Sequence, residues 1–386
     1  MKAFDSRPLR LLFIFEYGQR AGDPMTVSLI HSLKTRLPGL RISCVHGVFS
    51  KYRPGGLHPE RLVNFAWTYL CVALRLLFSR PDAVLVRTAP PGVQLWTVWW
   101  ARWRGAPTFC WLMDYHPEME ARQLEKRGQA WAARILRRID AALMPRFAAI
   151  VALDPAMAAV ARARAAGVEV LEHPTWETNG SAALTPVAYR PGQGAGPLRF
   201  AYSGNLGMAH DLTTFSALLG ELVRTRQVQL CVIGASAAGE ERFRKLGAER
   251  GIAIETHPRV PFGDLRDLYN RRQIDVGLVL LSDESSGLVS PSKFSAYINF
   301  GLPLVYVGPP GSNTAEVCAR FRGGFHLANG ASPAEIAAVA ERLLDPRQMT
   351  EAATGARAAA AHFAALNSES LSDLLAPRIV RASDKS

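Results

Sequence analysis

The sequence predicts an α/β protein with two domains, on three observations. Short apolar runs alternate with amphipathic stretches along the chain, the pattern of parallel strands joined by covering helices. The chain has 386 residues, 48% of them hydrophobic, which is more than one core usually holds. Residues 178–197 are rich in Gly, Pro and small side chains and show no period. We therefore expect a first domain at 1–177, a linker at 178–197 and a second domain at 198–365.

The apolar runs place the strands. In the first domain we expect them at 10–15, 41–45, 83–87, 107–112, 149–153 and 168–172. The second domain opens with a strand at 198–202 and a helix, and its further strands are expected at 228–233, 252–256, 275–281, 303–307 and 324–327. The Ala-rich chain after residue 333 is predicted to be helical. Residues 366–386 are expected to be the end of the last helix and a polar tail that frays from about Arg378.

The charge is concentrated in the first half of the chain. The formal net charge is +12, and residues 1–180 hold 24 Lys and Arg against 14 Asp and Glu. A basic face suits nucleic acid, an anionic bilayer or an anionic small molecule. No nucleic-acid recognition motif accompanies the charge, so we expect no nucleic-acid partner.

The five cysteines show no paired or metal-binding spacing, and the first fifteen residues do not have the pattern of a signal peptide. Both observations favour a protein of the reducing cytoplasm.

Two apolar stretches, 62–78 and 93–103, are shorter than the roughly 20 residues that a membrane span needs, and both contain Arg. They are rich in aromatic residues. They are expected to be core helices or, alternatively, helices that lie on a bilayer surface.

A glycine-rich turn, Tyr202–Gly207, follows the strand at 198–202 and precedes a helix. Glycines at 204 and 207 allow a ligand to approach the backbone, and unpaired N–H groups at such a turn bind phosphate. Tight packing of the turn is the alternative explanation.

A second segment, Ser290–Lys293, has the pattern of a helix start, with Ser290 as the N-cap, Pro291 in the first position and Lys293 in the first turn. A lysine there opposes the helix dipole, which indicates an anion nearby. The alternative is a lysine that simply reaches into solvent.

Taken together, Ser203–Gly207, Ser290–Lys293 and the helix-Gly-x-Pro-strand pattern of 296–305 resemble the nucleotide-sugar half of glycosyltransferase family 4. The resemblance implies the GT-B fold, two Rossmann-like domains facing each other across a cleft, and a retaining, metal-independent enzyme without a cofactor. It also implies a set of nucleotide-sugar-binding residues: Gly18, Gly204, Asn205, Gly207, Gly234, Pro261, Ser290, Pro291, Ser292 and Lys293.

In the first domain, Thr88–Gly92, Asp114–Glu118 and Glu172–Trp176 resemble segments of the bacterial exopolysaccharide and O-antigen branch, which includes fucosamine-type transferases. This implies transfer of a sugar from a UDP- or GDP-linked donor to a lipid-linked or polysaccharide acceptor, in exopolysaccharide or lipopolysaccharide synthesis. A lipid-linked acceptor and a basic, Trp-rich domain lead us to expect a peripheral protein on the anionic inner face of the cell membrane.

The candidate catalytic residues are Asp114, His116, Glu118 and Lys293. The first three follow a strand, at the edge where α/β proteins bind ligands. Asp114 or His116 is expected to align the acceptor hydroxyl, with the donor phosphate as the alternative base. The other explanation of these residues is a capped turn in which Pro117 and Glu118 open a helix.

The sequence departs from the family at three places. Leu288 and Ala296 stand where the family has two glutamates, and Met208–Asp211 lacks a basic residue that follows the glycine-rich turn in the family. The amino-terminal Gly-Gly loop is replaced by 16–25, where Gly18 and Gly22 are the candidates for its role.

Two other functions remain open. One is a nucleotide-sugar 2-epimerase of the same fold, and the other is a non-catalytic nucleotide- or membrane-binding relative, which the missing glutamates would permit.

Overall fold

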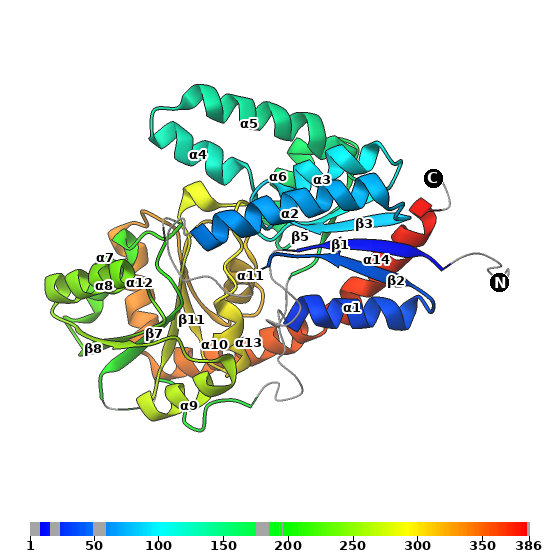
Figure 1. The fold of residues 1–386 in the computed structure, drawn as a ribbon. Helices are drawn as coiled ribbons and strands as arrows, with labels where there is room; N and C mark the ends of the chain where they lie inside the picture. Colours follow the sequence, from blue (N-terminus) through cyan, green and yellow to red (C-terminus); the bar gives the residue numbers. More distant parts are fainter. Residues whose placement is uncertain are drawn as a thin grey trace. The chain divides into compact units, whose positions relative to one another are not determined.

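The computed structural model describes residues 8–15, 24–48, 59–174, 185–192, 194, 196–207 and 209–383 (Figure 1). Their contacts divide them into two compact units. Unit 1 holds the described residues up to 174 together with 287–290 and 366–383. Unit 2 holds the described residues in 185–286 and 291–365.

Unit 1 is built on a six-stranded sheet in the order β2-β1-β3-β4-β5-β6, in which every pairing is parallel. The strands lie within one residue of their predicted positions. They are β1 (Arg10–Ile14), β2 (Arg41–Val45), β3 (Ala83–Arg87), β4 (Thr108–Trp111), β5 (Ala149–Ala152) and β6 (Glu169–Glu172). Strands β4 and β5 are buried along their whole length, because helices cover both faces of the sheet.

The helices of unit 1 follow the strands in alternation. They are α1 (Pro24–Arg36), α2 (Pro59–Phe78), α3 (Val93–Arg102), α4 (Glu118–Lys126), α5 (Ala130–Leu143), α6 (Pro155–Arg164) and α14 (Ser368–Ser383), with a short 3-10 turn at Met144–Arg146.

Helix α14 corrects the prediction of a frayed tail. It runs from Ser368 to Ser383 and packs against α1, and Leu371, Leu375 and Ile379 are buried in the core of unit 1. These residues recur every four positions, so they line one face of the helix. Arg378, where fraying was expected to begin, instead forms an ion pair with Glu169. In Figure 1 the red α14 lies beside the blue α1.

Unit 2 is built on a second six-stranded parallel sheet, in the order β12-β11-β10-β7-β8-β9. Its strands also lie within one residue of the predicted positions. They are β7 (Leu198–Ser203), β8 (Val228–Ile233), β9 (Ala253–His257), β10 (Val276–Leu280), β11 (Leu304–Val307) and β12 (Gly324–Leu327). The strand order reverses at β7, and ligands of such sheets bind beyond the carboxyl ends of the strands at that point.

The helices of unit 2 cover this sheet. They are α7 (Thr213–Leu222), α8 (Ala237–Arg250), α9 (Phe262–Arg272), α10 (Phe294–Asn299), α11 (Asn313–Ala319), α12 (Pro333–Leu344) and α13 (Pro346–Ala364), with a 3-10 turn at Asp283–Ser285. The two doubly wound sheets confirm the predicted α/β class.

The later part of the predicted linker, 178–197, is packed on unit 2. The N–H of Val187 donates to the carbonyl of Phe300 (3.0 Å), and the N–H of Gly192 donates to the carboxylate of Asp275 (2.7 Å). Residues 185–192 therefore belong to the second unit, because their backbone polar groups find partners there. Residues 178–184 lie outside the described part of the chain.

Candidate functional site

The glycine-rich turn lies at the carboxyl end of β7, where the strand order of unit 2 reverses. Gly204 has φ +105°, a backbone conformation that other residues rarely adopt. A Cβ at this position would lie 3.0 Å from Cε of Lys293. Glycine is thus required at 204 both by the backbone and by the close approach of the lysine side chain.

The start of the next helix differs from the prediction. Helix α10 begins at Phe294, and Lys293 is its N-cap residue rather than a member of its first turn. Ser290 does not cap it, because its side chain is hydrogen-bonded to Asp154 in unit 1. The carbonyl of Ser292 accepts the N–H of Ser295 (3.2 Å). Lys293 therefore lies at the N-terminal end of α10 but outside its first turn, and the helix has only six residues, so the position of Lys293 is judged from its contacts.

The Lys293 ammonium lies in a half-buried site. Its Nζ is 2.9 Å from Nε2 of His210 and 5.0 Å from the centre of the Tyr202 ring. Burial lowers the pKa of Lys293 to about 8. Within the described part of the chain, no carboxylate pairs with this ammonium, so an anion entering here would meet an uncompensated positive charge.

The contacts of His210 determine its tautomer. Burial, together with the charge of Lys293, lowers its pKa to about 3, so the imidazole is neutral at pH 7. An ammonium group can only donate, and Nε2 must accept from Lys293. The ring proton is then on Nδ1, which donates to the carbonyl of Gly207 (3.3 Å). The N–H of Gly207 also points to this Nδ1 (3.1 Å), so the ring and the glycine-rich turn are joined through one nitrogen.

Two further predicted residues lie at the neighbouring strand end. Asn205 accepts the N–H of Ser236 through its side-chain oxygen (3.2 Å), which ties the turn to the N-cap of α8. Gly234 ends β8 with φ +70°, and a Cβ there would lie 3.2 Å from Cα of Arg259. Pro261, two residues farther on, is the N-cap of α9. The structure thus gathers Gly204, Asn205, Gly207, Gly234 and Lys293 around the carboxyl ends of β7 and β8.

Sequence reasoning missed two residues of this site. His210 stands in the loop that was noted for lacking a basic residue. Arg242, on α8, is exposed, and its guanidinium donates to the carbonyl of His210 (3.3 Å). A cation therefore does reach the loop, but from a helix about thirty residues later, and no local motif could have revealed it.

In unit 1, two of the candidate catalytic residues follow β4 directly. The hydroxyl of Thr88 accepts the N–H groups of Met113 (2.9 Å) and Asp114 (3.3 Å), which fixes this turn. Burial raises the pKa of Asp114 above its usual value. His116 Nδ1 lies 2.6 Å from Oε1 of Glu120. The two residues are four positions apart, and the carboxylate orients the imidazole.

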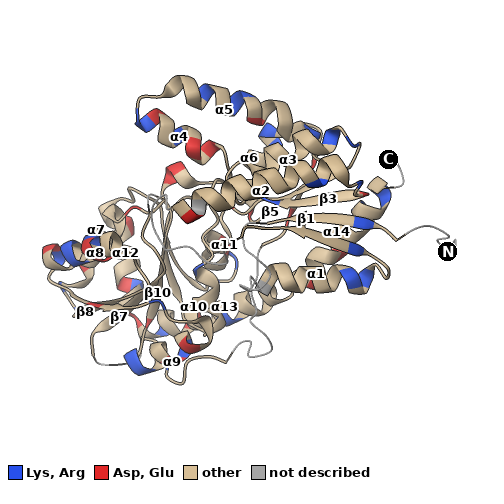
Figure 2. Ribbon diagram, in the orientation of Figure 1, with Lys and Arg blue, Asp and Glu red and all other residues tan. Residues whose placement is uncertain are grey.

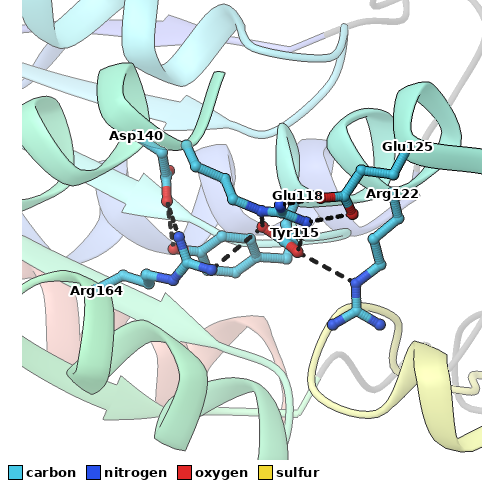
Figure 3. A network of polar contacts seen from close by, with 7 residues as sticks. Tyr115, Glu118, Arg122, Glu125, Asp140 and Arg164 are labelled. Atoms are coloured by element: carbon cyan, nitrogen blue, oxygen red, sulfur yellow. Dashed lines mark hydrogen bonds and ion pairs between the residues drawn. The ribbon is translucent and has the colours of Figure 1, made fainter. Parts of the chain in front are cut away.

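Glu118 has a different environment from Asp114 and His116. Figure 3 shows arginine side chains converging on it, and Arg122, Arg137 and Arg164 lie 3.2, 2.9 and 3.2 Å from its carboxylate. Burial raises its pKa, but hydrogen bonds from Arg137 and Arg122 outweigh this and hold the pKa below the usual value. The carboxylate thus joins α4, α5 and α6 and has little capacity to accept a proton, which indicates a structural role.

The same network continues to Asp140. Its carboxylate lies 3.3 Å from the hydroxyl of Tyr115 and 3.7 Å from Arg164 (Figure 3). Burial raises the pKa of Asp140 to about 6. This network packs the α4–α5 hairpin onto the sheet.

The positions at which the family has glutamates are apolar and buried. Leu288 is 3% exposed and belongs to the core of unit 1, and Ala296 is 7% exposed on α10. No carboxylate can reach a ligand from either position.

A hollow of about 280 Å³ lies near the amino ends of β7, β8 and β9, lined by Arg199, Gln229 and Ala253. Parallel sheets bind ligands at the opposite ends of their strands, so this hollow is not the candidate site.

Gly18, Gly22 and Met208 lie outside the described residues. Among the residues that the structure describes, no group of three or more His, Cys, Asp and Glu side chains is placed to hold a metal ion. In that same part of the chain, no helix has the length and apolar character to cross a membrane.

No family model and no curated protein sequence matches the chain. Solved structures do match over nearly the whole chain. WaaG, a glycosyltransferase involved in lipopolysaccharide biosynthesis, is 15% identical, with a TM-score of 0.63 over 94% of this chain and 99% of that one. The chain has the GT-B fold.

Two other structures have the same fold. Alr3699/HepE of Anabaena, solved in complex with UDP-glucose, is 13% identical, with a TM-score of 0.60 over 98% of this chain and 100% of that one. A glycosyltransferase from Rickettsia africae ESF-5 is 11% identical, with a TM-score of 0.59 over 97% of this chain and 99% of that one. At these identities the likeness establishes the architecture and not the reaction.

Proposed function

We propose that the chain is a glycosyltransferase that transfers a sugar from a nucleotide-sugar donor to a lipid-linked or saccharide acceptor in the synthesis of a bacterial surface polysaccharide. The observation that carries the proposal is the anion site at the carboxyl end of β7. There Lys293 has no carboxylate partner in the described chain and contacts Nε2 of His210, whose Nδ1 lies against the glycine-rich turn at Gly207.

This site suits a diphosphate. Negative charge develops on the diphosphate as the bond to the sugar breaks, and preorganised cations and N–H groups stabilise that charge without proton transfer. Lys293 supplies one such cation, and Arg242 adds a second at the same loop. The solved complexes of Alr3699/HepE with UDP-glucose and with UDP support a nucleotide-sugar donor for this chain as well, which we propose to be UDP- or GDP-linked.

The acceptor is proposed to bind in unit 1 beside Asp114 and His116. The short contact with Glu120 holds the imidazole of His116 in one orientation, which is what alignment of an acceptor hydroxyl requires. Glu118 is not included, because its carboxylate is occupied by three arginines. Retention of configuration and independence from a metal are proposed on the resemblance to family 4.

A peripheral position on an anionic membrane is part of the proposal, because unit 1 exposes large apolar side chains. Trp67, Trp103 and Trp131 are 46%, 74% and 64% exposed. Further exposed apolar residues on the same helices include Leu70, Leu74, Phe78 and Ile135. Exposed apolar side chains gathered on a few helices are typical of proteins that bind partners or membranes.

Nucleotide binding by a lysine variant tests the donor site. Lys293→Met keeps most of the side-chain volume and removes the charge, and Lys245→Met, on the exposed surface of α8, is the matched control. We expect calorimetry to show binding of UDP or GDP by the natural protein, about tenfold weaker or more in Lys293→Met and unchanged in Lys245→Met. Equal affinity in both variants would overturn the proposed site.

The two competing functions, a non-catalytic relative and a nucleotide-sugar 2-epimerase, predict different results in binding and activity measurements. If no nucleotide binds to the natural protein, a non-catalytic relative without a donor site is the better description. Incubation with UDP-N-acetylglucosamine alone, followed by chromatography of the sugar, would reveal a 2-epimerase, since that reaction needs no acceptor.

A further inference from the structure

We propose that an apolar groove in unit 1 holds the hydrocarbon chain of the lipid-linked acceptor, an inference that rests on the proposed function. The groove encloses about 400 Å³ among side chains of α2, α3 and α5. Its walls include Leu95, Trp96, Trp99, Leu136 and Ile139. Its volume is within the range of small-molecule sites.

The aromatic wall of the groove is fixed and apolar. Trp96 and Trp99 are stacked with their ring centres 5.7 Å apart. The indole N–H of Trp96 donates to the carbonyl of Tyr69 (3.0 Å), so the polar edge of that ring is satisfied on α2. The ring surface that the two residues turn to the groove is left for an apolar ligand, which gains from each methylene it buries there.

The groove borders the candidate acceptor residues. Pro117 and Glu120 line it, and Glu120 is the one charged side chain in the described lining. The same Glu120 carboxylate holds His116 at 2.6 Å. A chain lying in the groove therefore brings the group attached to it close to His116, where the acceptor hydroxyl is needed.

The charge around the groove suits a lipid with an anionic headgroup. Arg134 and Arg138 are exposed on α5, on the turns that carry Ile135 and Ile139. Neither has an ion-pair partner in the described part of the chain. Figure 2 shows basic positions in blue along α5. The phosphate groups that join a sugar to a lipid chain would be attracted to this helix.

The chain offers matched pairs of residues that separate the groove from a general membrane surface. Trp99 and Ile139 line the groove. Trp103, at the C-cap of α3, and Ile135, on α5, lie about one turn away from them and do not line it. All four side chains are more than a third exposed, so their truncation leaves the core intact.

The test is direct binding of geranylgeranyl diphosphate to the full-length protein, with saturating UDP to occupy the donor site and inorganic diphosphate as the control ligand. We expect saturable binding of the lipid that is about tenfold weaker in Trp99→Ala and in Ile139→Ser. In Trp103→Ala and Ile135→Ser we expect a change of less than about twofold.

Equal weakening in all four variants would overturn the groove and indicate a flat membrane contact. Binding that inorganic diphosphate reproduces would overturn it too, since the hydrocarbon chain would then contribute nothing. UDP binding is measured separately in every variant. Its absence from the natural protein would count against the proposed donor site and not against the groove.

Discussion

Nζ of Lys293 lies 2.9 Å from Nε2 of His210, although the two residues are 83 positions apart in the chain. The contact joins the loop after β7 to the segment that enters α10. Because the neutral imidazole can only accept from the ammonium, it holds one N–H of Lys293 and leaves two for a ligand. His210 is therefore a positioning residue for the proposed diphosphate site.

Substitution of His210 tests that role. We expect His210→Ala to weaken UDP binding about fivefold, because Lys293 loses the acceptor that orients it. His210→Gln should recover part of the affinity, since its amide oxygen is also an acceptor. Calorimetry measures both, and unchanged affinity in His210→Ala would show that Lys293 needs no such support.

The pH dependence of donor binding follows from the depressed pKa of Lys293. With that pKa at about 8, the free protein loses the positive charge as the pH rises through 8. Anion binding must then take up a proton, so the dissociation constant for UDP should rise by up to about tenfold per pH unit above 8. Titrations between pH 7 and 9.5 check this, and Lys293→Met should remove the slope. A flat profile in the natural protein would mean that the lysine charge does not contribute.

Gly204→Ala should impair the proposed donor site in two ways, because it strains the backbone at residue 204 and displaces the side chain of Lys293. The new Cβ would meet Cε of Lys293 at 3.0 Å, at a residue whose φ is +105°. Gly251→Ala is the control, because Gly251 also has a positive φ but its Cβ would meet nothing within 4 Å. We expect both variants to lose about 1–2 kcal/mol of unfolding free energy, and Gly204→Ala alone to lose UDP affinity. Equal UDP affinity in the two alanine variants would contradict the steric argument.

Glu118→Gln is expected to reduce the stability of unit 1, and His116→Ala is expected to reduce its activity. Removing this carboxylate leaves three arginines without their shared partner, so we expect a loss of about 3 kcal/mol in urea unfolding. His116→Ala, by contrast, should abolish most sugar transfer and leave the unfolding midpoint nearly unchanged. A Glu118→Gln variant that is as stable as the natural protein but inactive would contradict the structural role of Glu118 and indicate a catalytic one.

The sequence predicted the strands well. A strand that is buried on both faces consists of a continuous run of mostly apolar residues, as in β4 and β10, and such runs are easy to recognise. It missed the last turns of α14, which were expected to fray from about Arg378, although Leu371, Leu375 and Ile379 are spaced for one helix face. It also failed at Ser290, whose helix-start pattern is local, whereas its hydrogen bond to Asp154 joins segments far apart in the chain.

The candidate site was predicted only in part for the same reason. Gly204 and Lys293 belong to recognisable local motifs. The role of Glu118 depends on Arg137 and Arg164, which arrive from two later helices. These contacts join residues far apart in the chain, so no local sequence pattern predicts them. The same is true of the contact between His210 and Lys293.

The packing of α14 on α1 has a consequence for the order in which the protein is made. Every strand and helix of unit 2 precedes α14 in the chain, and so do all the other elements of unit 1. On the ribosome, unit 2 can complete its sheet while the face of unit 1 that receives Leu375 and Ile379 is still open. The first unit to be synthesised is thus the last to close, and a fragment that stops at residue 365 would leave that apolar face exposed to aggregation.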